Sequence, residues 1–317
     1  MIITDIERHF ERHFTEYSRI SSENKVKFEK LRAVLSQMRK EGIDGILLKG
    51  ADLIPRVYGV LGARRLGDAD LLVHEGDLAA LDRLLTRLGY RPVIDGNPAY
   101  MDPDHTLALD IVTTVWYADD QNALWQRAVR RELQGIPVKG LGVNDLLVYL
   151  SAYSVVHRAC LSPQFGRDIA LILAKEEVDW DVVADEASRC HLKVPLYHGL
   201  SFASTHYTGI AVPDLALGRL APSTVGERLW YRFFERVVTD KPLAELGHLL
   251  LLITRPRSKK WRWLRDVFLP SPAFLKYRYG EPGVAHPVRT RLRRGVSLVV
   301  RAQVLLARVA ARLVTRP

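Results

Sequence analysis

Apolar residues near the N-terminus follow two patterns, first one with helical spacing and then one continuous run. The helical positions are Leu31, Val34, Leu35 and Met38. They predict a helix over residues 5–40, and Gly42 is a stop signal directly after it. The continuous run over residues 43–50 is typical of a short strand that is buried on both faces. A short helix is expected over residues 51–59.

Three further strands are predicted, over residues 68–73, 89–95 and 105–116. Between the first two, Asp77 is placed to cap an amphipathic helix. The apolar face of that helix consists of Leu78, Leu81, Leu85 and Leu88. Strands that alternate with helices in this way indicate an α/β unit of roughly 140 residues.

The pattern becomes helical after Asn144 and stays so to about Thr254. Proline and arginine then dominate residues 255–290, which we expect to form a linker or a surface wrap, and residues 290–316 predict a final helix. The expected division has four parts: an N-terminal helical segment (1–29), an α/β unit (30–140), a helical domain (141–250), and a basic linker with an amphipathic C-terminal helix (251–317).

Charge is distributed unevenly along the 317 residues, whose net charge is +10. Residues 251–317 carry 16 Lys and Arg against 2 acidic residues, whereas the residues before them carry 30 basic and 34 acidic ones. Two cysteines cannot form a disulfide framework, which favours a reducing, cytoplasmic location. The charged N-terminus lacks the apolar segment of a signal peptide, and no apolar run approaches the ~18 residues of a membrane span.

Two aspartates stand near the start of the strand predicted over residues 68–73. Side chains alternate along a strand, so Asp68, Asp70 and Leu72 share one face. Like charges on one face repel each other, and a divalent cation would remove that cost. Asp110 is likewise an isolated charge within an apolar strand. If the two strands are neighbours, three carboxylates converge, which can hold two metal ions for displacement at a phosphoryl group.

A structural alternative remains open for the same aspartates. Asp68 can cap the turn after Gly67, while Asp70 pairs with Arg64 or Arg65. The turn at Lys49 and Gly50, between a strand and a helix, suits a phosphate instead: glycine allows close backbone approach, and lysine adds a charge. In that interpretation Arg64 and Arg65 clamp further phosphate oxygens.

The stretches LLKGADLIPRVYG (47–59) and RRLGDADLLV (64–73) resemble the signature of the uncharacterised nucleotidyltransferase family, within the DNA polymerase β-like nucleotidyltransferase superfamily. Members show an apolar strand ending in Lys-Gly, a short helix with a tyrosine, and then Arg-x-x-Gly-Asp-x-Asp-Leu-Leu-Val. Further similarity follows over residues 148–159, 167–183 and 271–280. The resemblance therefore covers most of residues 30–280.

The resemblance implies an α+β fold: a polymerase β-like palm, which is a mixed sheet with flanking helices, followed by a helical domain and the basic helical tail. It implies two Mg²⁺ ions, with metal-binding and catalytic roles for Asp68, Asp70 and Asp110. The residues expected to bind the nucleoside triphosphate are Lys49, Gly50, Arg64, Arg65 and Gly67.

The expected activity is a Mg²⁺-dependent transfer of a nucleoside monophosphate from an NTP, such as ATP, to a hydroxyl, with release of pyrophosphate. The acceptor stays open between a small molecule, a saccharide and a peptide. The alternative is a non-catalytic nucleotide-binding or scaffold protein on the same fold, held peripherally at a membrane through its basic tail.

The tail itself, residues 255–316, has three interpretations. Arginines seven residues apart define one face of the last helix, and aliphatic residues lie elsewhere on it. The arginines are Arg294, Arg301 and Arg308, extended by Arg312 and Arg316, and the aliphatic residues are Leu298, Leu305, Val309 and Leu313. Such a helix suits an anionic surface at the inner face of a membrane. Binding of nucleic acid is less favoured because no known motif is present, and simple docking on the protein body is the third interpretation.

Overall fold

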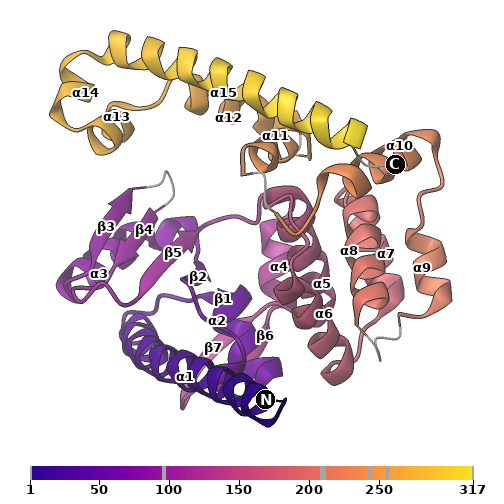
Figure 1. The fold of residues 1–317 in the computed structure, drawn as a ribbon. Helices are drawn as coiled ribbons and strands as arrows, with labels where there is room; N and C mark the ends of the chain where they lie inside the picture. The colour runs from indigo at the N-terminus through magenta and orange to yellow at the C-terminus, as the bar shows by residue number, and fades with distance from the viewer. Residues whose placement is uncertain (1, 95–97, 208–211, 242–243, 255–256, 316–317) are drawn as a thin grey trace. The chain divides into compact units, whose positions relative to one another are not determined.

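The computed structural model describes residues 2–94, 98–207, 212–241, 244–254 and 257–315, and these form two compact units. The first comprises Met1–Val115 and Asp120–Gly142, and the second comprises Trp116–Asp119 and Val143–Pro317. The strands of the sheet belong to the first unit, and the second is built from helices (Figure 1). The finer division into four parts stays a prediction, and helix α1 (Ile2–Lys40) runs without a break across the expected boundary at residues 29 and 30.

The first unit contains a mixed sheet of seven strands in the order β3-β4-β5-β2-β1-β7-β6. The strands are β1 (Ile46–Leu48), β2 (Ala69–Leu72), β3 (Arg91–Ile94), β4 (Pro98–Met101), β5 (Ala108–Val112), β6 (Val129–Leu133) and β7 (Ile136–Gly140). Strand β2 pairs with β5 in parallel, as β1 does with β7, and the other neighbouring pairs are antiparallel. The predicted α+β class with a mixed-sheet palm is therefore confirmed.

Helix α1 covers one face of this sheet through the apolar positions that its spacing predicted. Leu31 and Met38 are buried in one core cluster with Leu71 of β2 and Ile111 of β5. The other helical segments of the unit are α2 (Lys49–Leu53), the π-helix η1 (Ile54–Tyr58), the short 3-10 helices η2 (Leu61–Ala63) and η3 (Glu75–Asp77), α3 (Leu78–Arg87) and α4 (Gln121–Arg127). Asp70 of β2 and Asp110 of β5 lie on the opposite face of the sheet, which also carries the buried Leu72.

Three strands were not predicted from the sequence, namely β4 and the hairpin of β6 and β7. The hairpin turns at Gln134 and Gly135, which have φ values of 49° and 82°. A two-residue turn of this kind needs left-handed backbone at both positions, and glycine supplies it at the second. Residue 95, at the end of the predicted strand 89–95, lies outside the described residues.

The second unit is a succession of helices. They are α5 (Val143–Ser151), the π-helix η4 (Ala152–His157), α6 (Pro163–Lys175), α7 (Trp180–Arg189), α8 (Lys193–His206), α9 (Asp214–Leu220), α10 (Val225–Val237), α11 (Ala244–Thr254), α12 (Arg257–Phe268), α13 (Pro272–Tyr279), α14 (Glu281–Ala285) and α15 (Pro287–Thr315). Within the described ranges, none of the chain's helices has the length and apolar character that crossing a membrane requires.

Residues 255–290, expected to form a linker or a surface wrap, are largely helical in the part that the structure describes. That part forms α12, α13 and α14. Pro272 and Pro282, two of the prolines that suggested a linker, stand in the first turns of helices, where a missing N–H costs nothing. Ser271 caps α13 by accepting a hydrogen bond from the N–H of Phe274. Residues 255 and 256 lie outside the described residues.

His198 is a buried titratable group in the core of the second unit. Its ring stacks on Phe234 and meets Tyr231 edge-on, with centroids 6.3 Å and 5.6 Å away. Among the described residues its Nε2 has no hydrogen-bond partner. Burial lowers the pKa of the imidazole to about 4.

We expect this histidine to make the fold less stable in mild acid. An unfolded histidine binds a proton near pH 6.5, whereas folded His198 resists protonation down to about pH 4, so the stability it contributes is lost as the pH falls between these values. The free energy of unfolding should drop by about 2 kcal/mol more between pH 7 and pH 5 in the wild type than in His198→Gln, as urea titrations measure. His206→Gln, an exposed change on the same helix, should keep the wild-type dependence. Equal pH dependence in all three proteins would refute the assignment.

Candidate metal centre on the sheet

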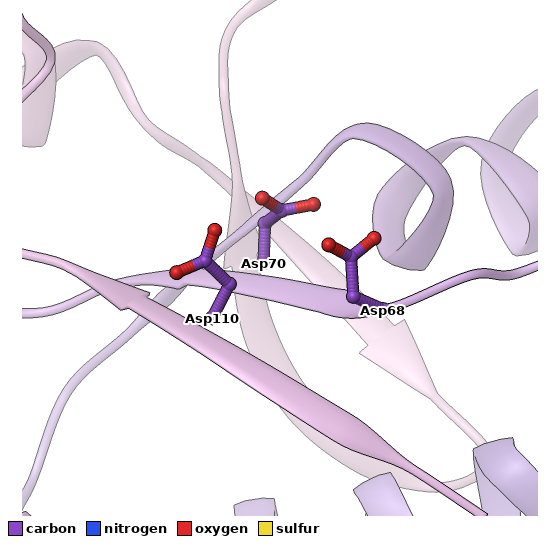
Figure 2. Close-up of side chains that lie close together, drawn as sticks. All are labelled: Asp68, Asp70 and Asp110. Atoms are coloured by element: carbon purple, nitrogen blue, oxygen red, sulfur yellow. The ribbon is translucent and has the colours of Figure 1, made fainter. Parts of the chain in front are cut away.

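Three carboxylates meet on the face of the sheet that α1 does not cover. One oxygen from each of Asp68, Asp70 and Asp110 lies within 4.8 Å of the others (Figure 2). Asp68 is exposed, Asp110 is half-buried, and Asp70 is buried. Among the described residues, these three carboxylates form a group of side chains that could hold a metal ion.

Strand pairing brings these residues together. Asp70 and Asp110 are direct partners in the parallel pair of β2 and β5. Asp68 stands two residues before Asp70, and alternation along the strand places both on the same face. The sequence predicted this face for each strand separately, and the parallel register supplies the convergence.

Electrostatics make Asp70 the most constrained member of the group. Burial raises the pKa of the carboxyl, Lys49 lowers it, and the neighbouring Asp68 and Asp110 raise it, and together these effects bring the pKa to about 6. The Nζ atom of Lys49 lies 2.5 Å from Oδ1 of Asp70. A buried carboxylate beside two others is stabilised by a nearby positive charge. In the protein without a ligand, the ammonium group of Lys49 supplies that charge.

Lys49 holds this contact from an uncommon backbone conformation. It follows β1, whose last residue Leu48 pairs with Asp70, and this register places Lys49 beside the aspartates. Its φ is 48°, in the left-handed region that non-glycine residues seldom adopt. Such conformations persist where surrounding contacts hold them, and they cluster at functional sites.

Gly50 and Arg64 lie against each other beside Lys49. A Cβ atom on Gly50 would stand 2.3 Å from Nη1 of Arg64, so a larger residue at this position would displace the end of the arginine side chain. The structure thus brings Arg64 to the Lys49–Gly50 turn, as the phosphate-binding hypothesis requires, and a cationic patch lies next to the carboxylates.

Arg65 and Gly67 are placed differently from the other predicted nucleotide-binding residues. The guanidinium of Arg65 is exposed and pairs with Glu23 of α1 at 3.0 Å. Gly67 is exposed, and a Cβ added there would meet nothing within 4 Å. Their roles toward a nucleotide stay predictions, with space for a ligand at Gly67.

Asn24 of α1 was missed in the sequence although it positions the loop before Asp68. Its side chain is buried, donates hydrogen bonds to the carbonyls of Leu61 and Arg64 at 2.7 Å each, and accepts one from the N–H of Leu66 at 2.9 Å. Lys27, one turn later, donates to the carbonyls of Leu66 and Gly67. The sequence did hold a signal for this role. Asn24 precedes the buried Phe28 by four positions, so it is a polar residue on the apolar face of the helix.

The donor set fits a hard divalent cation. Carboxylate oxygens are the ligands that Mg²⁺ prefers, and it is commonly held by one or two carboxylates together with substrate phosphates. The exposed and half-buried positions of Asp68 and Asp110 leave the group open on one side. The residues could therefore hold Mg²⁺ while a phosphate ligand approaches from solvent.

Residues 6–208 match the sequence model of a family described as uncharacterised nucleotidyltransferase. The chain belongs to that family. The match includes the whole sheet, all three aspartates and the helices of the second unit up to α8, so the predicted membership is confirmed. Helices α9 to α15 lie beyond it. No curated protein matches the chain.

Two solved structures are similar to this nucleotidyltransferase family member. One is the solution structure of the antibiotic-resistance factor ANT(2'')-Ia, with 16% identity, a TM-score of 0.41, and coverage of 58% of this chain and 100% of that one. The other is the crystal structure of an antigenic nucleotidyltransferase-like protein from Paracoccidioides brasiliensis, with 18% identity, a TM-score of 0.39, and coverage of 55% and 93%.

Proposed function

We propose that this nucleotidyltransferase family member transfers a nucleoside monophosphate from an NTP to a hydroxyl of an acceptor, with release of pyrophosphate and dependence on Mg²⁺. The observation that supports the proposal is the convergence of Asp68, Asp70 and Asp110 beside a lysine and an arginine. The acceptor class is a small molecule, a saccharide or a peptide.

In this proposal Asp68, Asp70 and Asp110 hold two Mg²⁺ ions, which when bound neutralise the charge that develops on the phosphates. Lys49 and Arg64 bind phosphate oxygens, and Gly50 lets the backbone approach them. The new bond joins the acceptor oxygen to the α-phosphorus, and the bond to the pyrophosphate oxygen breaks. In the proposal, the carboxylate of Asp110, which is half-buried, accepts the proton of the acceptor hydroxyl.

Ligand-dependent stabilisation tests the site without knowledge of the acceptor. Thermal unfolding is followed with α,β-methylene ATP, which cannot be cleaved at the α–β bond, with Mg²⁺, and with both. We expect a clear rise in Tm only with both together, equivalent to about 2.7 kcal/mol at a ligand concentration one hundred times Kd. Asp110→Asn should lose this rise. A rise that is equal without Mg²⁺, or unchanged in Asp110→Asn, would contradict the proposed metal site.

The reaction itself is tested with ATP labelled at either the α- or the γ-phosphate and a pool of candidate acceptors. Nucleotidyl transfer moves the α-label to the acceptor and releases the γ-label as pyrophosphate. Transfer of the γ-label to the acceptor would instead identify a phosphotransferase and overturn the proposed reaction.

The alternative, a non-catalytic nucleotide-binding or scaffold protein, is favoured by one observation. The ammonium of Lys49 already neutralises Asp70 at 2.5 Å, so the buried carboxylate has a cation without any metal. This alternative predicts nucleotide binding that is independent of Mg²⁺ and no transfer of the α-label. Lys49→Ala should strengthen Mn²⁺ binding if the lysine competes for Asp70, whereas the Mg²⁺ dependence of nucleotide binding and the fate of the α-label distinguish the two functions.

Both cysteines of the described residues, Cys160 and Cys190, are free thiols. Burial raises the pKa of the Cys190 thiol to about 12. A reducing, cytoplasmic location stays a proposal, which is supported by the presence of only two cysteines in the sequence.

A further inference from the structure

Helix α15 has an unusual composition. Over Pro287–Thr315 it contains seven arginines and no acidic residue. It packs against α10, α11 and α12 of its own unit (Figure 1). It lies beyond the part of the chain that matches the family, so nothing in the proposed nucleotidyl transfer accounts for it.

The aliphatic residues that the sequence set apart from the arginines face the protein, as the docking interpretation expects. Leu305 is buried, and Leu298, Val309 and Leu313 are partly buried. On the same side, three arginines donate to backbone carbonyls: Arg291 to Pro270, Arg294 to Val267 and Arg312 to Val237. This side of α15 is therefore occupied by docking on the second unit, and Arg316 lies outside the described residues.

The opposite side of α15 carries a second apolar stripe that the sequence analysis did not separate from the first. The stripe consists of Val288, Leu292, Val296, Val299, Leu306 and Val314, which are between 54% and 85% exposed. Their spacing of three, four, seven and eight positions places them on one face of the helix. Six exposed aliphatic side chains in line are more than the scattered apolar residues of an ordinary surface.

Two further observations extend this stripe. The exposed Arg289 and Arg293 follow stripe residues directly in sequence, so positive charge lies along its border. Leu306 also lines an apolar cavity of about 500 Å³ among α10, α11 and α15, together with Leu229 and Leu249. These two leucines are 61% and 38% exposed, so apolar surface continues from the stripe to the cavity.

We propose that the outer stripe of α15 docks on the surface of an anionic phospholipid bilayer. Aliphatic side chains with arginines beside them match the boundary between acyl chains and acidic headgroups. Two copies of α15 packed face to face would bring arginines together without a single acidic partner on the helix. Nucleic acid offers phosphates for the arginines but nothing for six aliphatic residues, and the stripe has no aromatic side chain for base stacking.

Vesicle co-sedimentation of the full chain tests the proposal. The probes are vesicles of pure phosphatidylcholine and vesicles with about one third phosphatidylglycerol, an acidic fraction that provides the negative surface potential. We expect binding to the anionic vesicles that weakens as salt is raised, and little binding to the neutral ones. The double variant Leu292→Ser with Val299→Ser should bind anionic vesicles at least about tenfold more weakly, because two aliphatic side chains no longer leave water.

A matched control is Leu215→Ser with Val182→Ser, which removes two exposed aliphatic residues from α9 and α7 of the same unit. It should bind the vesicles like the wild type, and circular dichroism should show both double variants folded. Equal binding of anionic vesicles by the stripe variant and the wild type would overturn the proposal, as would no vesicle binding at all. The proposal would also be overturned if the stripe variant kept vesicle binding but lost a dimer, or a complex with duplex DNA, that the wild type and the control variant form.

Discussion

Replacing Asp68 with asparagine should reduce nucleotidyl transfer by roughly three orders of magnitude. Metal ions at a phosphoryl centre contribute several kcal/mol of transition-state stabilisation, and each ~1.4 kcal/mol is a factor of ten in rate. Asp68 is the exposed member of the three carboxylates, so this change alters the charge of the site without opening the core. The measurement is initial transfer of an α-labelled NTP, together with Mn²⁺ binding by electron paramagnetic resonance.

The same substitution should leave the stability of the metal-free protein unchanged or slightly higher. Asp68 is one of the charges that raise the pKa of Asp70, so the neutral amide removes a repulsion. Thermal unfolding in a chelator measures this, and Asp77→Asn is the control because the Asp77 side chain makes no capping hydrogen bond to α3. Full transfer activity in Asp68→Asn would reject the metal assignment. Loss of activity together with a large fall in Tm would show a structural role instead.

The carboxylate site was predictable because its signal is local to two strands. An aspartate inside an apolar strand is costly, and two such strands stood out in the sequence at Asp70 and Asp110. Their adjacency was not predictable from periodicity alone. It depends on β2 pairing with β5 in parallel, while β3 and β4 lie between them in the chain and outside them in the sheet.

Other features depend on contacts that no local pattern encodes. The pairing of Arg65 with Glu23 and the contact of Arg64 with Gly50 each join residues through the tertiary fold, so two neighbouring arginines with the same sequence context differ in their surroundings. The orientation of helix α15 likewise depends on tertiary contacts. Its aliphatic residues form two stripes, each with arginines nearby, and only packing reveals that Leu305 faces inward while Leu292 faces solvent.

Asn24→Ala should lower the free energy of unfolding by about 3 kcal/mol. Three hydrogen bonds would be lost, and the buried N–H of Leu66 would have no acceptor in place of the amide oxygen. Each such loss costs about 1 kcal/mol, and more where the abandoned group stays buried. Urea unfolding measures the change, and Asn122→Ala, an exposed asparagine on α4 of the same unit, should shift the midpoint little.

The same variant should also weaken nucleotide binding, because Asn24 fixes the carbonyl of Arg64 and the N–H of Leu66 on either side of Arg65. A loosened loop would let Arg64 move away from Gly50, while Asp70, held in β2, stays in place. We therefore expect Asn24→Ala to raise KM for the NTP several-fold with a smaller change in kcat. An unchanged KM in a destabilised variant would show that α1 stabilises the fold without positioning the phosphate-binding turn, and an unchanged urea midpoint would contradict the hydrogen bonds themselves.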